Sequence, residues 1–272
     1  MSRETAIYLS LCLFVGVAGW ILVHALLERQ RDADLAKITD EIARLIALPP
    51  SASFHQTVDA VRMFINDHSQ TKIDAAFHAM NGDTVAFAEG VIAHARDPSV
   101  ERVHMECSTR AYLMSRVLQA MGVETRGIGI FATSGDYSSH SFLDVFNGDS
   151  RTWETVDPDY DLYWVSKRSG KRTSLAEASA DLDDVSPCGR DRCGWDVVSR
   201  DGHTPKSLVD KLDILAVNHR EKDLRYSVYT PRADLERKLS FEGKTGTFCE
   251  LFPRRCRDGF KAIAAQGSEP AP

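Results

Sequence analysis

The chain has 272 residues, of which 43% are hydrophobic and 26% are charged. This length and composition allow one large or two small domains with a buried core, and they exclude a chain that is disordered throughout. With 33 lysines and arginines against 39 aspartates and glutamates, the formal net charge is -6. A basic excess typical of nucleic-acid-binding proteins is missing, so we expect no nucleic-acid partner.

The first segment is apolar. Residues 5–27 include no aspartate, glutamate, lysine or arginine, and a helix of that length spans about 34 Å, enough for the hydrocarbon core of a bilayer. We therefore expect a transmembrane anchor over residues 1–28. A cleaved signal peptide is the alternative, because Val23, His24 and Ala25 loosely fit a cleavage site. The apolar run is, however, longer than the core of a typical signal peptide.

A second helical pattern follows the expected anchor. Its apolar residues recur every three or four positions, at Leu35, Ile38, Ile42 and Leu45. Pro49 and Pro50 end the pattern, so we predict a juxtamembrane amphipathic helix over 29–50. Such a helix packs on the body or lies at the membrane surface, since two heptads are too few for a coiled coil.

The remaining chain predicts one α+β domain over 51–262, with its core at about 83–165. Apolar spacing indicates helices over residues 54–66, 71–80, 83–96 and 207–219. The tail over 263–272 consists mainly of small residues, proline and polar residues. We expect this tail to be disordered.

Four of the six cysteines form two short-range pairs, Cys188 with Cys193 and Cys249 with Cys256. Their spacings are poor for zinc sites and suit short disulfide loops. We therefore expect two disulfides, with other pairings of the same four cysteines left open. Cys107 stands alone in the middle of the chain.

Two observations disagree about the side of the membrane on which the body lies. Arg3 precedes the apolar segment, whereas Arg29, Arg31 and Lys37 follow it, and this count slightly favours a cytoplasmic body. Disulfides instead form in oxidising compartments. We give the cysteines more weight and expect a single-pass protein of the inner (plasma) membrane whose body faces the periplasm or the cell exterior. Its oligomeric state stays open.

A helix over residues 107–121 is predicted in the middle of the chain. Residues on one face of it are Cys107, Ala111, Met114, Leu118 and Met121. Gly122 ends the pattern. Cys107 thus lies in the first turn, where the positive end of a helix dipole favours a nucleophilic thiolate.

The chain then becomes extended. Residues 123–133 are rich in glycine and β-branched residues, and residues 140–146 are predicted as a strand that ends at the turn residues Asn147 and Gly148. The segment WETVDP follows after the turn. We expect an antiparallel hairpin.

The register of this hairpin depends on the loop. A two-residue loop at 148–149 pairs His140 with Asp157, whereas a loop at 147–148 pairs His140 with Thr155 and leaves Asp157 as a diagonal neighbour. Both registers place His140 and Asp157 on one face.

That face also carries three aromatic rings, Phe142, Phe146 and Trp153. If the helix that begins at Cys107 packs on these rings, its thiol approaches His140, which Asp157 can orient in a Cys/His/Asp relay. A lone cysteine is more often a small buried hydrophobe, and a histidine on a strand is more often structural. The agreement of residue order, helix start and hairpin face favours the relay.

These segments resemble the transglutaminase-like superfamily. The resemblance rests on a cysteine that opens a helix, followed by GVETRG, HSFLDVF and WETVDP, and it covers about a fifth of the chain. It implies Cys107 as the nucleophile, His140 as the general base and acid, and Asp157 as the orienting carboxylate. It also implies a papain-like α+β core in which helices pack on an antiparallel sheet.

The chain departs from the family pattern at two positions. Many members have glycine two residues before the cysteine and tryptophan two residues after the histidine, where this chain has Met105 and Phe142. Calcium-binding cysteine proteinases of this superfamily place acidic residues around the cysteine. Here Glu106 is followed, after the cysteine, by Ser108 and Thr109, so we expect no calcium requirement.

Metal signals are weak elsewhere. Asp157, Asp159 and Asp161 resemble the start of a calcium-binding EF-hand loop, but Leu162 and Arg168 occupy the positions that need glycine and glutamate. The histidines show no HExxH spacing. We expect no metal and no other cofactor.

The resemblance implies a membrane-anchored cysteine hydrolase that acts on peptide or isopeptide bonds through a thioester, with a protein or peptide as its substrate. Two alternatives stay open. A protein cross-linking acyltransferase would need a site that keeps water from the acyl-enzyme. A catalytically silent module would keep the fold only to bind a peptide or glycan.

Overall fold

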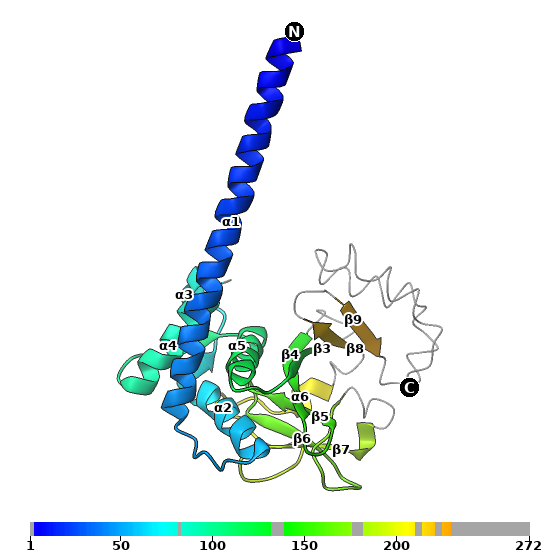
Figure 1. The fold of residues 1–272 in the computed structure, drawn as a ribbon. Helices are drawn as coiled ribbons and strands as arrows, with labels where there is room; N and C mark the ends of the chain where they lie inside the picture. The colour runs from blue at the N-terminus through cyan, green and yellow to red at the C-terminus, as the bar shows by residue number, and fades with distance from the viewer. Residues whose placement is uncertain are drawn as a thin grey trace.

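The computed structural model describes residues 3–80, 83–131, 139–175, 182–209, 214–220 and 225–229. The expected tail over 263–272 and the Cys249 and Cys256 pair lie outside these residues. The fold is α+β, with helices at one side and an antiparallel sheet at the other, as the sequence predicts (Figure 1).

The first helix, α1, runs without interruption over Arg3–Ile46 and projects far from the body (Figure 1). Its last part enters the protein, where Leu35 and Ile42 are buried. The chain leaves the helix at Ala47, which adopts a positive φ of 50°, just before Pro49. Two separate helical segments were expected here, and the structure has one.

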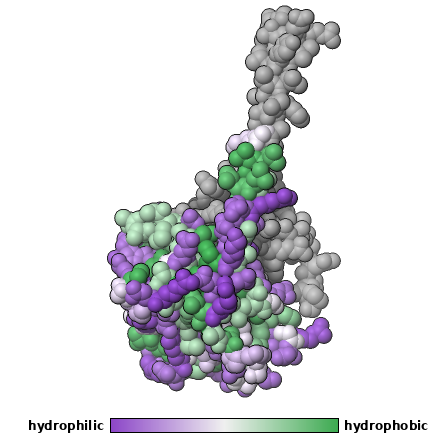
Figure 2. Space-filling view, turned by 60° about the vertical axis from the view of Figure 1, so that its left-hand side comes forward, coloured by the Kyte–Doolittle hydropathy of each residue, from purple (hydrophilic) through white to green (hydrophobic). Residues whose placement is uncertain are grey.

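The part of α1 next to the body exposes large apolar side chains, and Figure 2 shows the leucines and the valine among them in green. The exposed side chains are Trp20, Leu22, Val23, Leu26 and Leu27. The side chains of residues 3–18 lie outside the described part of the chain. Among the residues that are described, no helix combines the length and the apolar character needed to cross a bilayer.

Four further helices pack together with the end of α1. They are α2 (Phe54–His68), α3 (Ala75–Met80), α4 (Thr84–Arg96) and α5 (Cys107–Ala120). Ser53 begins α2 with a capping box, in which Ser53 and Gln56 exchange hydrogen bonds between side chain and backbone. Asp83 caps α4 through the backbone N–H of Ala86.

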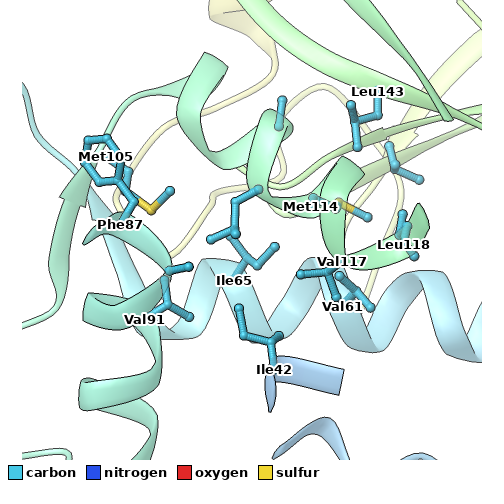
Figure 3. Packing of buried hydrophobic residues seen from close by; sticks show 14 of the residues in the cluster. Ile42, Val61, Ile65, Phe87, Val91, Met105, Met114, Val117, Leu118 and Leu143 are labelled. Atoms are coloured by element: carbon cyan, nitrogen blue, oxygen red, sulfur yellow. The ribbon is translucent and has the colours of Figure 1, made fainter. Parts of the chain in front are cut away.

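The first core lies between these helices and the sheet (Figure 3). Its central side chains are Ile42, Val61, Ile65, Val91, Met114, Val117 and Leu118. Each fully buried aliphatic side chain of this kind contributes about 1.5–3 kcal/mol through the hydrophobic effect. This core holds α5, and with it Cys107, in place.

The described sheet has the strand order β7-β6-β5-β4-β3-β8-β9. These strands are β3 (Thr125–Phe131), β4 (Ser139–Asn147), β5 (Thr152–Asp157), β6 (Leu162–Ser166), β7 (Val185–Cys188), β8 (Ile214–Arg220) and β9 (Arg225–Tyr229). A short parallel pair, β1 (Ser69–Thr71) with β2 (Val103–Met105), leads directly to α5.

The helix predicted over 207–219 is wrong. Helix α6 covers only Lys206–Val209, and residues 215–218 of the strand β8 pair with β3. Pairing with the sheet overrides the local helical spacing, because a strand's stability depends on neighbours that are distant in sequence.

The hairpin of β4 and β5 differs from both predicted registers. Asn147 pairs with Thr152, so the connection has four residues rather than two. Its last residue, Arg151, adopts a left-handed conformation with φ of 57°. The shift is an even number of residues, so His140 and Asp157 still face the same side of the sheet.

The helix α5 packs on the opposite face from the one predicted. Its apolar residues contact Leu143, Val145 and Val156, which share the first core. Phe142, on the other face, belongs to a second cluster with Ile128, Ile130, Tyr160, Leu162 and Trp164. The face of Phe142 also carries the buried carboxylate of Asp144.

The disulfide expected between Cys188 and Cys193 is confirmed. It joins the end of β7 to the following loop. The same two cysteines also form an isolated antiparallel β-bridge. The bond therefore closes a small loop at the edge of the sheet.

Candidate active site

Cys107 is the first residue of α5, directly after the strand β2 and the connecting residue Glu106. The backbone N–H of Glu106 donates to Thr109 Oγ1 at 3.3 Å, which fixes the entry into the helix. The thiol is free and partly exposed. A reagent or substrate can therefore reach the first turn of α5.

His140 and Asp157 form a buried pair on one face of the sheet. The ring nitrogen Nε2 of His140 lies 2.8 Å from Asp157 Oδ2. The second oxygen, Oδ1, accepts the backbone N–H groups of Asp159 at 2.9 Å and Tyr160 at 3.1 Å. The carboxylate is thus fixed by the turn that follows β5, and it fixes the histidine ring in turn.

Opposing effects act on the pKa of His140. Burial lowers this pKa, whereas the charge and hydrogen bond of Asp157, followed by the hydrogen bond and charge of Cys107, raise it. The net effect raises the pKa of His140 to about 10. Since Nε2 is taken by Asp157, Cys107 interacts with the Nδ1 side of the ring.

Aromatic rings enclose the histidine. The ring of Tyr160 meets His140 edge to face at 4.8 Å between centroids, and Phe142 lies at 5.3 Å. The hydroxyl of Tyr160 shares a hydrogen bond of 2.9 Å with Ser207. Burial raises the pKa of Tyr160. These rings keep water from one side of the imidazole.

A pocket of about 670 Å³ adjoins the site at Tyr160. Its wall includes Val197 and the disulfide-closed loop that carries Arg190 and Arg192. Arg190 is tied to Asp67 by two hydrogen bonds of 2.8 and 3.2 Å. The pocket therefore combines apolar and paired charged groups next to the candidate triad.

The structure brings together the three residues that the sequence singles out. His140 and Asp157 are in direct contact, and Cys107 acts on the His140 ring. Sequence reasoning missed Tyr160 and Asp159, although the segment DPDY contained the signal: the two residues directly follow the turn proline. Asp159 was considered only for a calcium loop. Within the described ranges, no cluster of three or more histidine, cysteine or acidic side chains is arranged to hold a metal ion.

Comparisons with known proteins give little further information. No protein-family model and no curated protein sequence matches the chain. A solved structure described as "a Putative Cysteine Protease from Cytophaga hutchinsonii" matches with a TM-score of 0.33 and 16% identity. The match covers 57% of this chain and 47% of that chain, so this chain spans about half of its length.

Proposed function

We propose that the chain is a membrane-anchored cysteine hydrolase of the transglutaminase-like type, which cleaves peptide or isopeptide bonds of a protein or peptide substrate. Cys107 is the nucleophile, His140 the general base and acid, and Asp157 the orienting carboxylate. The observation that carries the proposal is a buried imidazole whose Nε2 lies 2.8 Å from Asp157 Oδ2, with Cys107 close enough to raise the pKa of the same ring.

This arrangement favours a charged pair. An imidazole whose pKa is raised readily accepts the proton of the thiol, and the resulting thiolate is a stronger nucleophile than the thiol. Asp157 stabilises the imidazolium and selects the orientation in which Nδ1 faces the sulfur. Burial of the pair strengthens both interactions.

The reaction then has two steps. The thiolate of Cys107 attacks the carbonyl carbon, and the C–N bond breaks as His140 donates its proton to the leaving amine, which leaves a thioester. His140 next removes a proton from water, the resulting hydroxide attacks the thioester, and the C–S bond breaks to release the acid. The backbone N–H of Cys107, at the first turn of α5, is suited to stabilise the oxyanion.

Hydrolysis is favoured over transfer to an amine because the thiol of Cys107 is partly exposed. Water therefore reaches the position where the thioester forms, whereas a cross-linking acyltransferase must exclude it.

The proposed anchor is α1, whose exposed Trp20, Leu22 and Leu27 continue the apolar segment of residues 5–27. The disulfide of Cys188 with Cys193 supports a body outside the cytoplasm, because such bonds persist in oxidising compartments. The anchor is continuous with the helix that packs in the core.

An activated ester tests the proposal without knowledge of the natural substrate. The full chain in detergent should react with the p-nitrophenyl ester of an acetylated dipeptide in a burst, and mass spectrometry should find the acyl group on Cys107. The matched control is Cys107→Ser, which changes one atom. It should lose the burst but keep its fold, with a loss of stability below ~1.5 kcal/mol.

Absence of the burst in the wild-type chain would contradict the proposal. The chain would then be better described by the alternative of a catalytically silent module that binds a peptide or glycan. Transfer of the acyl group to added glycine amide in preference to water would instead favour the cross-linking acyltransferase.

A further inference from the structure

A second carboxylate lies on the other side of the His140 ring. Asp159 Oδ2 is 4.0 Å from His140 Nδ1, the ring nitrogen that Asp157 does not contact. Asp159 lies in the turn that follows β5, and its backbone N–H donates to Asp157 Oδ1 at 2.9 Å. Asp159 is 3% exposed, so its charge acts on the ring with little screening by water.

Asp159 is held by the helix that carries the thiol. Arg110, one turn after Cys107 on α5, is fully buried and donates from Nη1 to Asp159 Oδ1 at 2.9 Å and to the backbone oxygen of Asp159 at 3.1 Å. Thr71 donates to the same Oδ1 at 2.7 Å. Oδ1 is thus occupied, and Oδ2 is the oxygen that faces His140.

The guanidinium of Arg110 has further fixed partners. It donates to Asp201 at 3.0 Å, to the hydroxyl of Ser69 at 2.9 Å and to that of Thr71 at 2.8 Å. A buried arginine with this many partners has one orientation. It therefore fixes the distance between the first turn of α5 and the turn that carries both Asp157 and Asp159.

We propose that Asp159, which Arg110 holds in place, is a positioning residue for the candidate active site: its carboxylate stabilises positive charge at Nδ1 of His140. This inference rests on the proposed function. Asp157 and Asp159 would then bracket the imidazolium at its two nitrogens. The proton that leaves the thiol of Cys107 moves to Nδ1, where Asp159 stabilises it.

Within the described residues, the ionisable groups placed against His140 come from two elements. Asp157, Asp159 and Tyr160 come from the turn after β5, and Cys107 comes from α5. His203 contacts the far side of Tyr160, at 5.4 Å between ring centroids. Asp157 and Cys107 raise the pKa of His140, and the 4.0 Å approach of Asp159 to Nδ1 is the separate geometric observation on which the inference rests.

The test replaces one charge and keeps the shape. In Asp159→Asn the amide oxygen can still accept from Arg110 and Thr71, but the negative charge is lost. The titration midpoint of the His140 ring, measured by nitrogen-resolved NMR of the full chain, should fall by about one pH unit, a tenfold change in the protonated population. Asp159→Glu, which restores the charge, should recover most of this loss.

The matched control is Asp201→Asn. It removes an equivalent carboxylate from Arg110, but Asp201 has no described contact with His140. Its titration midpoint should equal that of the wild type. Equal midpoints in Asp159→Asn, Asp201→Asn and the wild type would overturn the inference.

A second pair of variants keeps the test decisive if Asp159→Asn does not fold. Arg110→Gln with Asp159→Asn removes both partners, so no unpaired buried charge remains. Its reference is Arg110→Gln alone. The titration midpoint of His140 in the double variant should lie below that of Arg110→Gln by the same amount as expected for Asp159→Asn. No difference between them would overturn the inference.

The two proposals fail separately. If the wild-type chain shows no acyl burst, the proposed function fails, whereas the NMR titration still reports whether Asp159 acts on His140. If the burst occurs and Asp159→Asn leaves both the midpoint and the pH profile of the burst unchanged, the inference alone fails.

Discussion

The two faces of the strands β4 and β5 are built for different tasks. The face toward α5 is aliphatic, with Leu143, Val145 and Val156 in the first core. The opposite face buries His140, Asp144 and Asp157, each with polar partners. The aliphatic face therefore holds the helix that begins at Cys107, whereas the candidate histidine and aspartate lie on the opposite face, beside the second apolar cluster.

Two buried aspartates on the face of His140 have different kinds of partners. Asp144 receives hydrogen bonds from Arg126 at 2.6 and 2.9 Å, from Thr155 at 2.6 Å and from Ser174 at 2.7 Å. Asp157 instead contacts His140 and backbone N–H groups. We expect Asp144 to serve the fold and Asp157 to serve the chemistry.

The largest effect is expected for Asp157→Asn. Turnover of the activated ester should fall by about 10²–10⁴-fold, because the imidazole loses its orientation and the stabilisation of its charge. Turnover is followed by p-nitrophenol release at steady state. A loss of less than threefold would show that Asp157 has no orienting role.

The matched variant on the same face is Asp144→Asn. It leaves the guanidinium of Arg126 without its carboxylate, and we expect a loss of about 3 kcal/mol in the free energy of unfolding. Turnover per folded molecule should stay near the wild-type value. Urea unfolding and ester turnover are both measured, and a large loss of turnover without loss of stability would reverse the assignment of the two aspartates.

The aliphatic face is tested by Leu118→Ala. Leu118 is fully buried in the first core, so the cavity should lower the free energy of unfolding by about 2–5 kcal/mol. The rate of Cys107 alkylation should change less than twofold as long as the chain is folded. A stability close to that of the wild type would mean that the helix is not held by this core.

A smaller effect is expected from the disulfide. Replacing both Cys188 and Cys193 by serine should lower the free energy of unfolding by about 2 kcal/mol, because the closed loop is short. Thermal unfolding with and without a reductant measures the loss. If the bond is native, a reductant lowers the wild-type midpoint and leaves that of the variant unchanged.

The pH dependence of stability gives the most gradual effect. The pKa of His140 is raised from 6.5 to about 10 by the net effect of Asp157 and Cys107 over burial. The contribution of His140 to the free energy of unfolding is therefore complete below pH 6.5. It is lost as the pH rises toward 10, by at most about 1.4 kcal/mol per pH unit. The stability difference between wild type and His140→Gln should shrink from pH 6 to pH 10; a constant or growing difference would contradict the raised pKa.

Local patterns were sufficient for much of the site. The spacing of apolar residues placed Cys107 in the first turn of a helix, and the period of two along β4 and β5 placed His140 and Asp157 on one face. These features depend on residues close in sequence. An even shift of register does not alter them, which is why they survived the wrong loop length.

Long-range pairing could not be predicted in the same way. The four-residue connection depends on Arg151 in a left-handed conformation, which is rare outside glycine and asparagine. The partners of Arg110 at positions 69, 71, 159 and 201 come from three separate segments. The strand β8 forms only because β3 offers an edge. Such contacts are set by the tertiary fold.

The interaction of Cys107 with His140 is the central claim, and the rate of Cys107 alkylation by iodoacetamide across pH 5–10 tests it most directly. The account predicts fast alkylation at neutral pH in the wild type and at least about a tenfold fall at pH 7 in His140→Ala, with reactivity regained only as an ordinary thiol ionises near pH 8.5. Asp157→Ala should fall between the two. Identical profiles in wild type and His140→Ala would contradict the account.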